Sequence, residues 1–218
     1  MLKYLFSLIT SVVLSVAVTL GLVHNFTASF PTSQLRLATY KITGDFGMSG
    51  SGVLISPGRL LTAAHVVANL QNGRVNGPDN TRYTYNILKT DIERDIAILD
   101  VYLDCPCRPV ADNTPDVDSD VVVVGFPLSA FKTVTFGLVQ GTAVQPELKR
   151  LVTQISAPVI FGNSGGPVFN KWGEVIGIVS MVSAAGDGFF GYAVPHIGWT
   201  VPVETIKDFI KDVSPQKR

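Results

Sequence analysis

The sequence predicts an all-β protein that begins with a long apolar helix and ends with a short amphipathic one. From residue 35 onward, short segments rich in Val, Ile, Thr, Tyr and Phe alternate with turns that contain Gly, Pro, Asn and Asp. Many short strands at regular spacing are typical of barrels and sandwiches. The predicted strands are residues 35–42, 52–55, 59–61, 81–88 and 95–101 in a first group, and 121–125, 133–144, 151–155, 167–169, 175–182 and 189–194 in a second.

The apolar helix is predicted at the N-terminus. Residues 4–23 contain no charged side chain, and Lys3 precedes them. As a helix this run is about 30 Å long, which matches the hydrocarbon core of a bilayer. We therefore predict a transmembrane anchor within residues 1–25, with the remainder of the chain exported, followed by a linker at 26–34. A cleaved signal peptide is the alternative, because small residues at 15–17 and 27–29 offer possible cleavage sites.

The two groups of strands are separated by a change in composition. Residues 105–120 carry three prolines and four aspartates, so we predict an interdomain linker at 109–120 between strand-rich halves at 35–108 and 121–200. A helix and tail follow at 201–218, because Ile206, Phe209, Ile210 and Val213 form an amphipathic stripe.

Charge and cysteine content exclude several classes of protein. Lysine plus arginine and aspartate plus glutamate both number 17, without the basic excess that nucleic-acid binding requires. Asp116, Asp118 and Asp120 alternate as in a calcium loop, but the stretch lacks the glycine and the glutamate of such a loop, so we predict a solvated strand entry and no metal site.

Cys105 and Cys107 are separated by one residue, and a bridge between them would be strained. We expect a loop with two thiols, with an intermolecular bond or a metal contact as lesser alternatives.

The most informative stretch is residues 161–167, which read FGNSGGP. Its three glycines allow backbone conformations with positive φ and a close approach to a ligand. Ser164 lies among them with its hydroxyl unobstructed by bulky neighbours. Such a loop can present a nucleophile and aim its own N–H groups at the oxyanion that nucleophilic attack creates.

A serine nucleophile needs a base, and the base needs a group that orients it. Of the three histidines, His65 follows an apolar strand and two alanines that leave room for close packing, whereas His196 is predicted at the surface. Asp95 opens an apolar strand, where a carboxylate requires hydrogen bonds, and a histidine Nδ1–H is a suitable partner. The competitors for this role are Asp91, Asp100 and Asp104, and spacing alone does not exclude Asp100, which closes the same strand.

The order His, Asp, Ser is that of chymotrypsin-like peptidases. The chain resembles the trypsin-like serine proteases, most closely the bacterial HtrA/Deg branch, from about residue 35 to 210. The matching stretches are residues 50–55, 61–67, 95–99, 162–167, 173–178 and 191–195.

The resemblance implies two six-stranded antiparallel barrels with the site between them. His65 and Asp95 would come from the first barrel and Ser164 from the second, and no metal or organic cofactor is implied. The oxyanion hole of the family corresponds to the N–H groups of Gly162 and Ser164, with Asn163 between them. Its substrate-binding strand corresponds to Ile178, Val179, Ser180, Met181 and Val182.

Two features depart from that branch. Its proteases usually carry PDZ domains after the peptidase, but this sequence stops at Arg218, so peptide sensing by a PDZ domain is not implied. Residues 156–161, before the nucleophile, are apolar and lack the acid that marks a pocket for Lys or Arg. Val159 and Ile160 are therefore predicted to line a pocket for small or medium aliphatic residues, unless they only pack the barrel.

We therefore predict a membrane-anchored serine endopeptidase that cleaves protein or peptide substrates through an acyl-enzyme. The sequence indicates no oligomeric state. One alternative is a catalytically inactive binding module with the same fold, which the complete set of His65, Asp95 and Ser164 disfavours. Another is a structural envelope protein, which would leave Ser164 and its glycines without a purpose.

Overall fold

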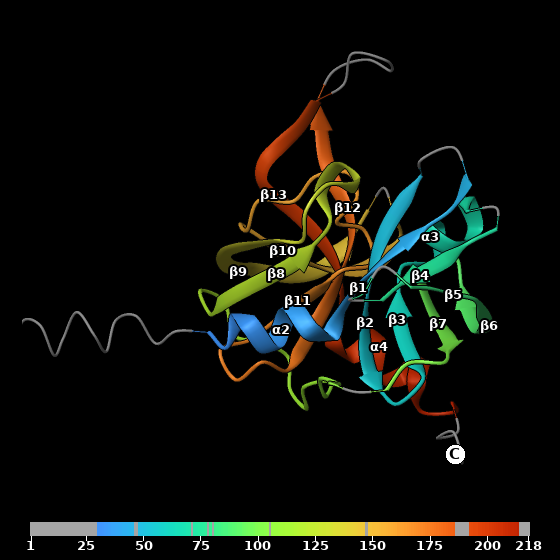
Figure 1. The fold of residues 1–218 in the computed structure, drawn as a ribbon. Coiled ribbons are helices and arrows are strands. Elements are labelled where there is room, and N and C mark those ends of the chain that lie inside the picture. The colour runs from blue at the N-terminus through green and yellow to red at the C-terminus, as the bar shows by residue number, and fades with distance from the viewer. Residues whose placement is uncertain are drawn as a thin grey trace, which may run out of the picture. The chain divides into compact units, whose positions relative to one another are not determined.

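The computed structural model describes residues 30–45, 48–70, 72–77, 79, 81–104, 106–146, 148–185 and 192–213, and these are mostly β-strand. Strands and helices follow one another in two groups (Figure 1). The first group is α2 (Thr32–Ala38), β1 (Thr39–Thr43), β2 (Ser49–Ser56), β3 (Arg59–Thr62), α3 (Ala64–Asn69), β4 (Arg74–Asn76), β5 (Arg82–Tyr83), β6 (Tyr85–Asp91) and β7 (Ile96–Val101). The second group is β8 (Asp120–Gly125), the 3-10 helix η2 (Pro127–Ser129), β9 (Thr133–Gln145), β10 (Arg150–Ile155), β11 (Pro167–Phe169), β12 (Val175–Ala185), β13 (Tyr192–Pro202) and α4 (Val203–Ile210).

The first group forms an antiparallel sheet of seven strands in the order β5-β4-β1-β2-β3-β7-β6. The six-stranded barrel predicted here is therefore wrong in detail, because the sheet stays open with β5 and β6 at its edges. Strand β5 is only two residues long and pairs with β4, and β6 pairs with β7, so these two edge strands do not pair with each other. The core of this half contains Ile42, Leu54, Leu60 and Leu99 among its buried side chains.

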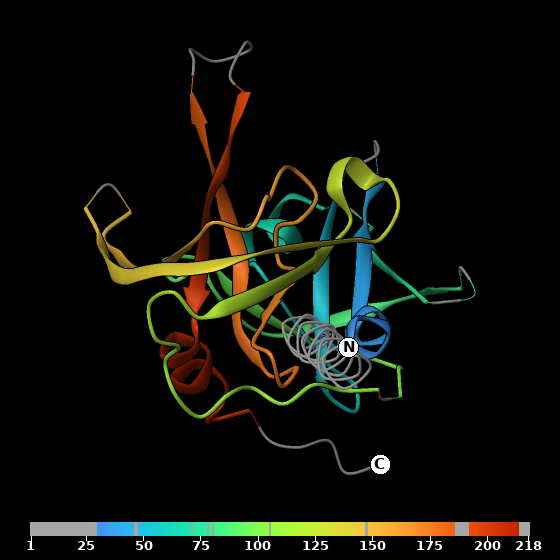
Figure 2. The same cartoon turned by 90° about the vertical axis from the view of Figure 1, so that its left-hand side faces the viewer.

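The second group forms a closed barrel of six strands in the order β10-β13-β12-β11-β8-β9, as predicted for this half. In β8, Val121 and Val123 belong to the barrel core, whereas Val122 and Val124 are buried outside that cluster. Both faces of β8 are covered because the strand also contacts β1 and β2 of the sheet. Figure 2 shows β12 and β13 running together away from the barrel as a long hairpin.

Two α-helices of the first group were not predicted from the sequence. Residues 35–42 were predicted as one strand, but α2 occupies Thr32–Ala38 and buries Leu35 and Ala38 on one face. Helix α3 was not predicted, because its six residues are too few to show helical periodicity beside the preceding apolar strand. The predicted C-terminal helix is present as α4, and it buries Ile206 and Phe209 against β7, β12 and β13.

The predicted linker at 109–120 is tied to the barrel at its beginning. Val110 forms a parallel bridge with Val175, and the N–H of Ala111 donates to the Val175 carbonyl at 2.9 Å. Cys107 is disulfide-bonded, so the expectation of two thiols is wrong, while Cys105 lies outside the described residues.

The predicted anchor within residues 1–25 also lies outside the described residues. Within the described ranges, every helix is too short or too polar to cross a bilayer.

Replacing Phe209 by alanine should destabilise the protein by about 3–5 kcal/mol, because the ring is fully buried and its loss leaves a cavity beneath α4. Urea denaturation should show a lower transition midpoint with an unchanged slope. Phe131→Ala is the matched control, since that ring is 90% exposed and its removal should change stability by less than about 0.5 kcal/mol. Equal effects of the two substitutions would contradict the packing role of Phe209.

Candidate active site

His65 lies at the start of a short helix that follows directly on a buried strand. Strand β3 ends at Thr62, and His65 is the second residue of α3. In the antiparallel pair β3–β7, Thr62 lies opposite Ala97, so the chain just before β7 reaches the beginning of α3. This pairing brings Asp95 beside His65 although the two are 30 residues apart.

Asp95 contacts both the ring and the backbone of His65. Its carboxylate oxygens lie 2.9 and 3.0 Å from Nδ1, and Oδ1 also accepts a hydrogen bond from the His65 backbone N–H at 3.0 Å. An ionised carboxylate only accepts hydrogen bonds, so Nδ1 carries a proton, and in the neutral imidazole the lone pair is then on Nε2. The ring is thereby held in the tautomer that a general base requires.

Asp95 is an ionised side chain in a buried position. It is 5% exposed and adopts the left-handed conformation with φ 57°. Burial acts to raise the pKa of Asp95, but the hydrogen bond and charge of His65 and the hydrogen bond from Ser180 outweigh it and hold the pKa below its ordinary value. The alternative, Asp100, lies opposite Arg59 in the β3–β7 pair and forms an ion pair with it at 2.9 Å.

Two residues of the closed barrel complete the surroundings of Asp95. Ser180 on β12 donates from Oγ to Asp95 Oδ2 at 2.5 Å. Arg150, the first residue of β10, donates from Nη2 to Ser180 Oγ at 2.6 Å and lies 3.6 Å from Asp95 Oδ2. The sequence assigned Ser180 to the substrate strand and Arg150 to nothing. No local pattern could have found these contacts, because Ser180 is 85 residues from Asp95 along the chain.

The loop that carries Ser164 is bound to the first half of the molecule. The N–H of Ser51 on β2 donates to the Ser164 carbonyl at 2.8 Å, and Ser51 Oγ donates to the Gly162 carbonyl at 2.8 Å. Gly165 has φ 78°, and a Cβ at this position would lie 2.1 Å from Thr62 Oγ1. Glycine is therefore required where the loop meets the strand that leads to His65.

Two backbone donors flank Asn163. The Asn163 N–H donates to the Ile160 carbonyl at 3.1 Å, whereas the N–H groups of Gly162 and Ser164 meet no acceptor among the described residues. Backbone N–H groups that are shielded from water normally donate a hydrogen bond. The N–H groups of Gly162 and Ser164 are therefore available to donate to an anionic oxygen.

The Ser164 hydroxyl makes no hydrogen bond to His65 or to any other described residue. In enzymes without a substrate, the hydrogen bond between nucleophile and base is often long and shortens when the substrate binds.

The other predicted substrate-binding residues on β12 differ in exposure. Ile178 and Val179 are buried, Met181 is 37% exposed, and the side chain of Val182 lies outside the described part of the structure. The backbone of Val179 accepts a hydrogen bond from Gly165 N–H at 2.6 Å and donates to the Gly166 carbonyl at 2.8 Å. The start of the predicted substrate strand is thus joined to the Ser164 loop.

Val159 and Ile160 precede that loop. Val159 is 2% exposed and belongs to the core of the closed barrel. Residue 198 beside it is glycine, and a Cβ at that position would lie 2.6 Å from Val159 Cγ2. Ile160 is half-buried. His196 is exposed, with Nδ1 2.9 Å from the carbonyl of Ser156, and His24 lies outside the described residues.

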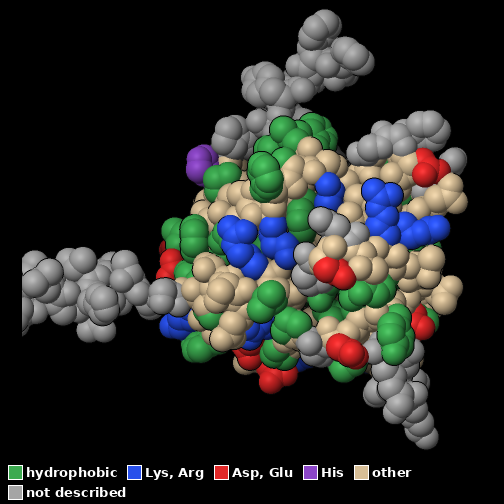
Figure 3. All heavy atoms as spheres, in the orientation of Figure 1, with side chains coloured by type: hydrophobic (Ala, Val, Ile, Leu, Met, Phe, Trp, Pro, Cys, Tyr) green, Lys and Arg blue, Asp and Glu red, His purple; other side chains and the backbone are tan. Residues whose placement is uncertain are grey.

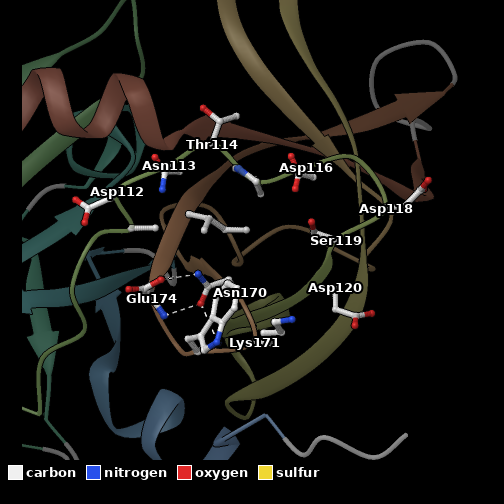
Figure 4. Close-up of a pocket in the computed structure, with 14 residues that line it drawn as sticks. Asp112, Asn113, Thr114, Asp116, Asp118, Ser119, Asp120, Asn170, Lys171 and Glu174 are labelled. Carbon is white, nitrogen blue, oxygen red and sulfur yellow. Dashed lines mark hydrogen bonds between the residues drawn. The ribbon is translucent and has the colours of Figure 1, made fainter.

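A cavity of about 530 Å³ is lined by residues between 111 and 120 and between 170 and 176, which include neither His65 nor Ser164 (Figure 4). Its walls include the predicted strand entry and the turn between β11 and β12, where Asn170 donates from Nδ2 to Glu174 at 2.8 Å. Within the described ranges, no group of three or more His, Cys, Asp or Glu side chains could hold a metal ion. The carboxyl side chains are spread around this cavity; the labelled ones are Asp112, Asp116, Asp118, Asp120 and Glu174.

Comparison with known proteins identifies the family. A model of the trypsin-like peptidase domain matches residues 50–178, a range that contains His65, Asp95 and Ser164. The chain belongs to this family. The three residues occur in the order His, Asp, Ser, which is the order of the catalytic residues in chymotrypsin-like peptidases.

Individual members of the trypsin-like peptidase family are similar over most of the chain. A probable periplasmic serine endoprotease, DegP-like, from Pseudomonas savastanoi pv. phaseolicola is 31% identical over 164 residues, which cover 73% of this chain and 33% of the relative. The serine protease HTRA1B from Danio rerio is 35% identical over 180 residues, covering 75% and 34%. This chain therefore spans about a third of the length of these curated relatives.

A solved structure gives the same picture of the fold. The active form of the Rv3671c protease from M. tuberculosis superposes with a TM-score of 0.73 at 27% sequence identity, and the match covers 87% of each chain. The closed barrel and the open sheet are thus the two halves of a chymotrypsin-like fold.

Asp95→Asn should weaken the dependence of stability on acid pH. The folded-state pKa of Asp95 is lowered, so its ionised form contributes stability above about pH 4, and this contribution is lost as the pH falls through the lower folded pKa. The difference in unfolding free energy between wild type and variant should therefore shrink between pH 7 and about pH 3. Urea denaturation at several pH values measures it, with the exposed Asp116→Asn as a matched control. A difference that stays constant over this range would contradict the prediction.

Proposed function

We propose that the protein is a serine endopeptidase in which Ser164 is the nucleophile, His65 the general base and Asp95 the residue that orients the base. The observation that supports this best is the contact between Asp95 and both the ring and the backbone of His65. The carboxylate of Asp95 makes three hydrogen-bonding contacts with one histidine, and the fold does not need so many contacts to place a partly exposed ring. The arrangement leaves Nε2 of His65 available to a neighbouring hydroxyl.

The proposed reaction is acyl transfer to Ser164 followed by hydrolysis. Ser164 Oγ attacks the scissile carbonyl while His65 Nε2 takes its proton, and Asp95 stabilises the imidazolium without itself becoming protonated. The N–H groups of Gly162 and Ser164, which meet no acceptor in the described chain, stabilise the oxyanion. His65 then protonates the leaving amine, and water releases the acyl group from Ser164.

We propose that the substrate lies along β12 and that the pocket for its side chain is small and apolar. Met181 on that strand is 37% exposed and accessible to a peptide. Val159 is buried in the barrel core, so of the two predicted pocket residues the half-buried, apolar Ile160 is the one that remains to line the pocket. Aliphatic residues of small or medium size therefore fit best before the cleaved bond, in agreement with the absence of an acid in residues 156–161.

We propose an extracytoplasmic location with the N-terminal segment as a membrane anchor. The DegP-like relative is named as periplasmic, and residues 4–23 of this chain are long and apolar enough to span a bilayer.

We propose no nucleic-acid partner. The face of the protein in Figure 3 carries its Lys and Arg side chains in separate groups with other surface between them, so this face offers no continuous basic stripe for a nucleic acid.

A fluorophosphonate probe that reacts with activated serines tests the nucleophile. Wild-type protein should be labelled, and Ser164→Ala should lose labelling and peptide hydrolysis while it keeps the circular dichroism spectrum of the folded protein. Ser33→Ala, at an exposed serine of α2, is the matched control and should be labelled like wild type. Hydrolysis that persists unchanged in Ser164→Ala would show that another residue is the nucleophile. Absence of labelling in folded wild-type protein would favour the inactive binding module.

A C-terminal fusion to alkaline phosphatase, which is active only after export, tests the location. The full chain should give phosphatase activity in intact bacteria, because the residues after the anchor are expected outside the cytoplasm. Deletion of residues 1–25 should abolish this activity, and extraction with carbonate should leave the full-length protein in the membrane fraction. Phosphatase activity that persists after the deletion would contradict the role of the segment.

A further inference from the structure

Asp95 is held by residues from both halves of the molecule, and Arg150 is the outermost of them. The side chain of Arg150 is 14% exposed, and its Nη2 donates to Ser180 Oγ at 2.6 Å. Ser180 has one hydroxyl proton, which it donates to Asp95 Oδ2. The hydrogen bonds therefore run in one direction, from the guanidinium through Ser180 to the carboxylate that holds His65.

The guanidinium also acts on Asp95 and its turn directly. Nη2 lies 3.6 Å from Asp95 Oδ2, and Nη1 donates to the backbone carbonyl of Glu93 at 3.4 Å, two residues before Asp95. Arg150 thus contacts the turn between β6 and β7 at two points while its own strand belongs to the closed barrel. A planar fork of donors is suited to such a task, because it fixes two acceptors in one geometry.

Burial shows that this arrangement is not an incidental surface contact. Arg150 Nε is buried and has no hydrogen-bond partner in the described structure, a position that is unfavourable for a charged group without compensation. The carboxylate of Asp95, itself 8% exposed in its side chain, supplies the compensating charge. Hydrogen bonds in a largely buried network strengthen one another, so the loss of one member affects the others.

We propose that Arg150 is a positioning residue for proteolysis, which fixes Ser180 and Asp95 so that His65 is held in its reactive orientation. This inference rests on the proposed function, but the contacts that carry it do not involve Ser164. Arg150 touches no reacting atom and acts through the two side chains between it and the imidazole. It also joins the catalytic aspartate of one half to the barrel that carries the nucleophile.

Steady-state hydrolysis of a peptide substrate tests the proposal. Arg150→Met should lower kcat about tenfold or more and leave KM within about twofold, because a small displacement of the base affects the transition state more than substrate binding. Arg150→Lys should recover most of kcat, because it restores a positive charge and a donor near Ser180. Arg82→Met, at an exposed arginine of β5, is the matched control and should keep wild-type values.

Proton NMR supplies a measurement that does not depend on activity. In the Ser164→Ala background, the His65 Nδ1 proton bonded to Asp95 should give a sharp low-field resonance, which Arg150→Met should broaden or remove and Arg150→Lys should retain. If the methionine variant does not fold, Arg150→Gln replaces it, since its shorter neutral amide should give the same losses. A folded Met or Gln variant with wild-type kcat and an unchanged resonance would overturn the proposal. If wild-type protein is inactive, the proposed function fails, and the resonance still decides whether Arg150 orders His65.

Discussion

The attachment of the Ser164 loop to β2 is the interaction on which the rest of the site depends. Ser51 is fully buried, and it binds the carbonyls of Ser164 and Gly162 through its N–H and its hydroxyl. The same hydroxyl accepts a hydrogen bond from the N–H of Phe126 at 3.1 Å, at the end of β8. Ser51 therefore joins β2 of the first half to the Ser164 loop and to the end of β8 in the second half. Gly165 lets the loop approach closely enough for the candidate nucleophile to lie beside the strand that leads to His65.

A buried carboxylate is the costly element of this site, and the structure surrounds it with donors. Asp95 accepts from the ring and backbone of His65 and from Ser180, and Arg150 lies behind Ser180. Removal of a charge from water is unfavourable unless several partners replace the lost hydration. The same partners that make the charge tolerable also fix the tautomer of His65, so that stability and proposed chemistry depend on one set of hydrogen bonds.

The sequence predicts those parts of the fold that local pattern encodes. Strand-forming segments and the order of His65, Asp95 and Ser164 are visible in it, because apolar runs and glycine-rich turns are local features. The apolar neighbours of Asp95 favour it over Asp100 but do not exclude Asp100, and the two are separated only by the β3–β7 register that pairs Asp100 with Arg59. The contacts of Ser180 and Arg150 likewise arise only when distant strands meet, and the open edge of the first sheet is a property of strand pairing that no local pattern encodes.

The division of the site between the halves has a consequence for the chain during its synthesis. Ser51 and His65 leave the ribosome early, but the loop that Ser51 binds and the strand that carries Ser180 are made more than a hundred residues later. A nascent chain that has folded only its first sheet holds His65 beside Asp95 but lacks both Ser164 and the hydrogen bond from Ser180. Under the proposed function, such a chain would cleave no peptide bond until the barrel has closed against the sheet.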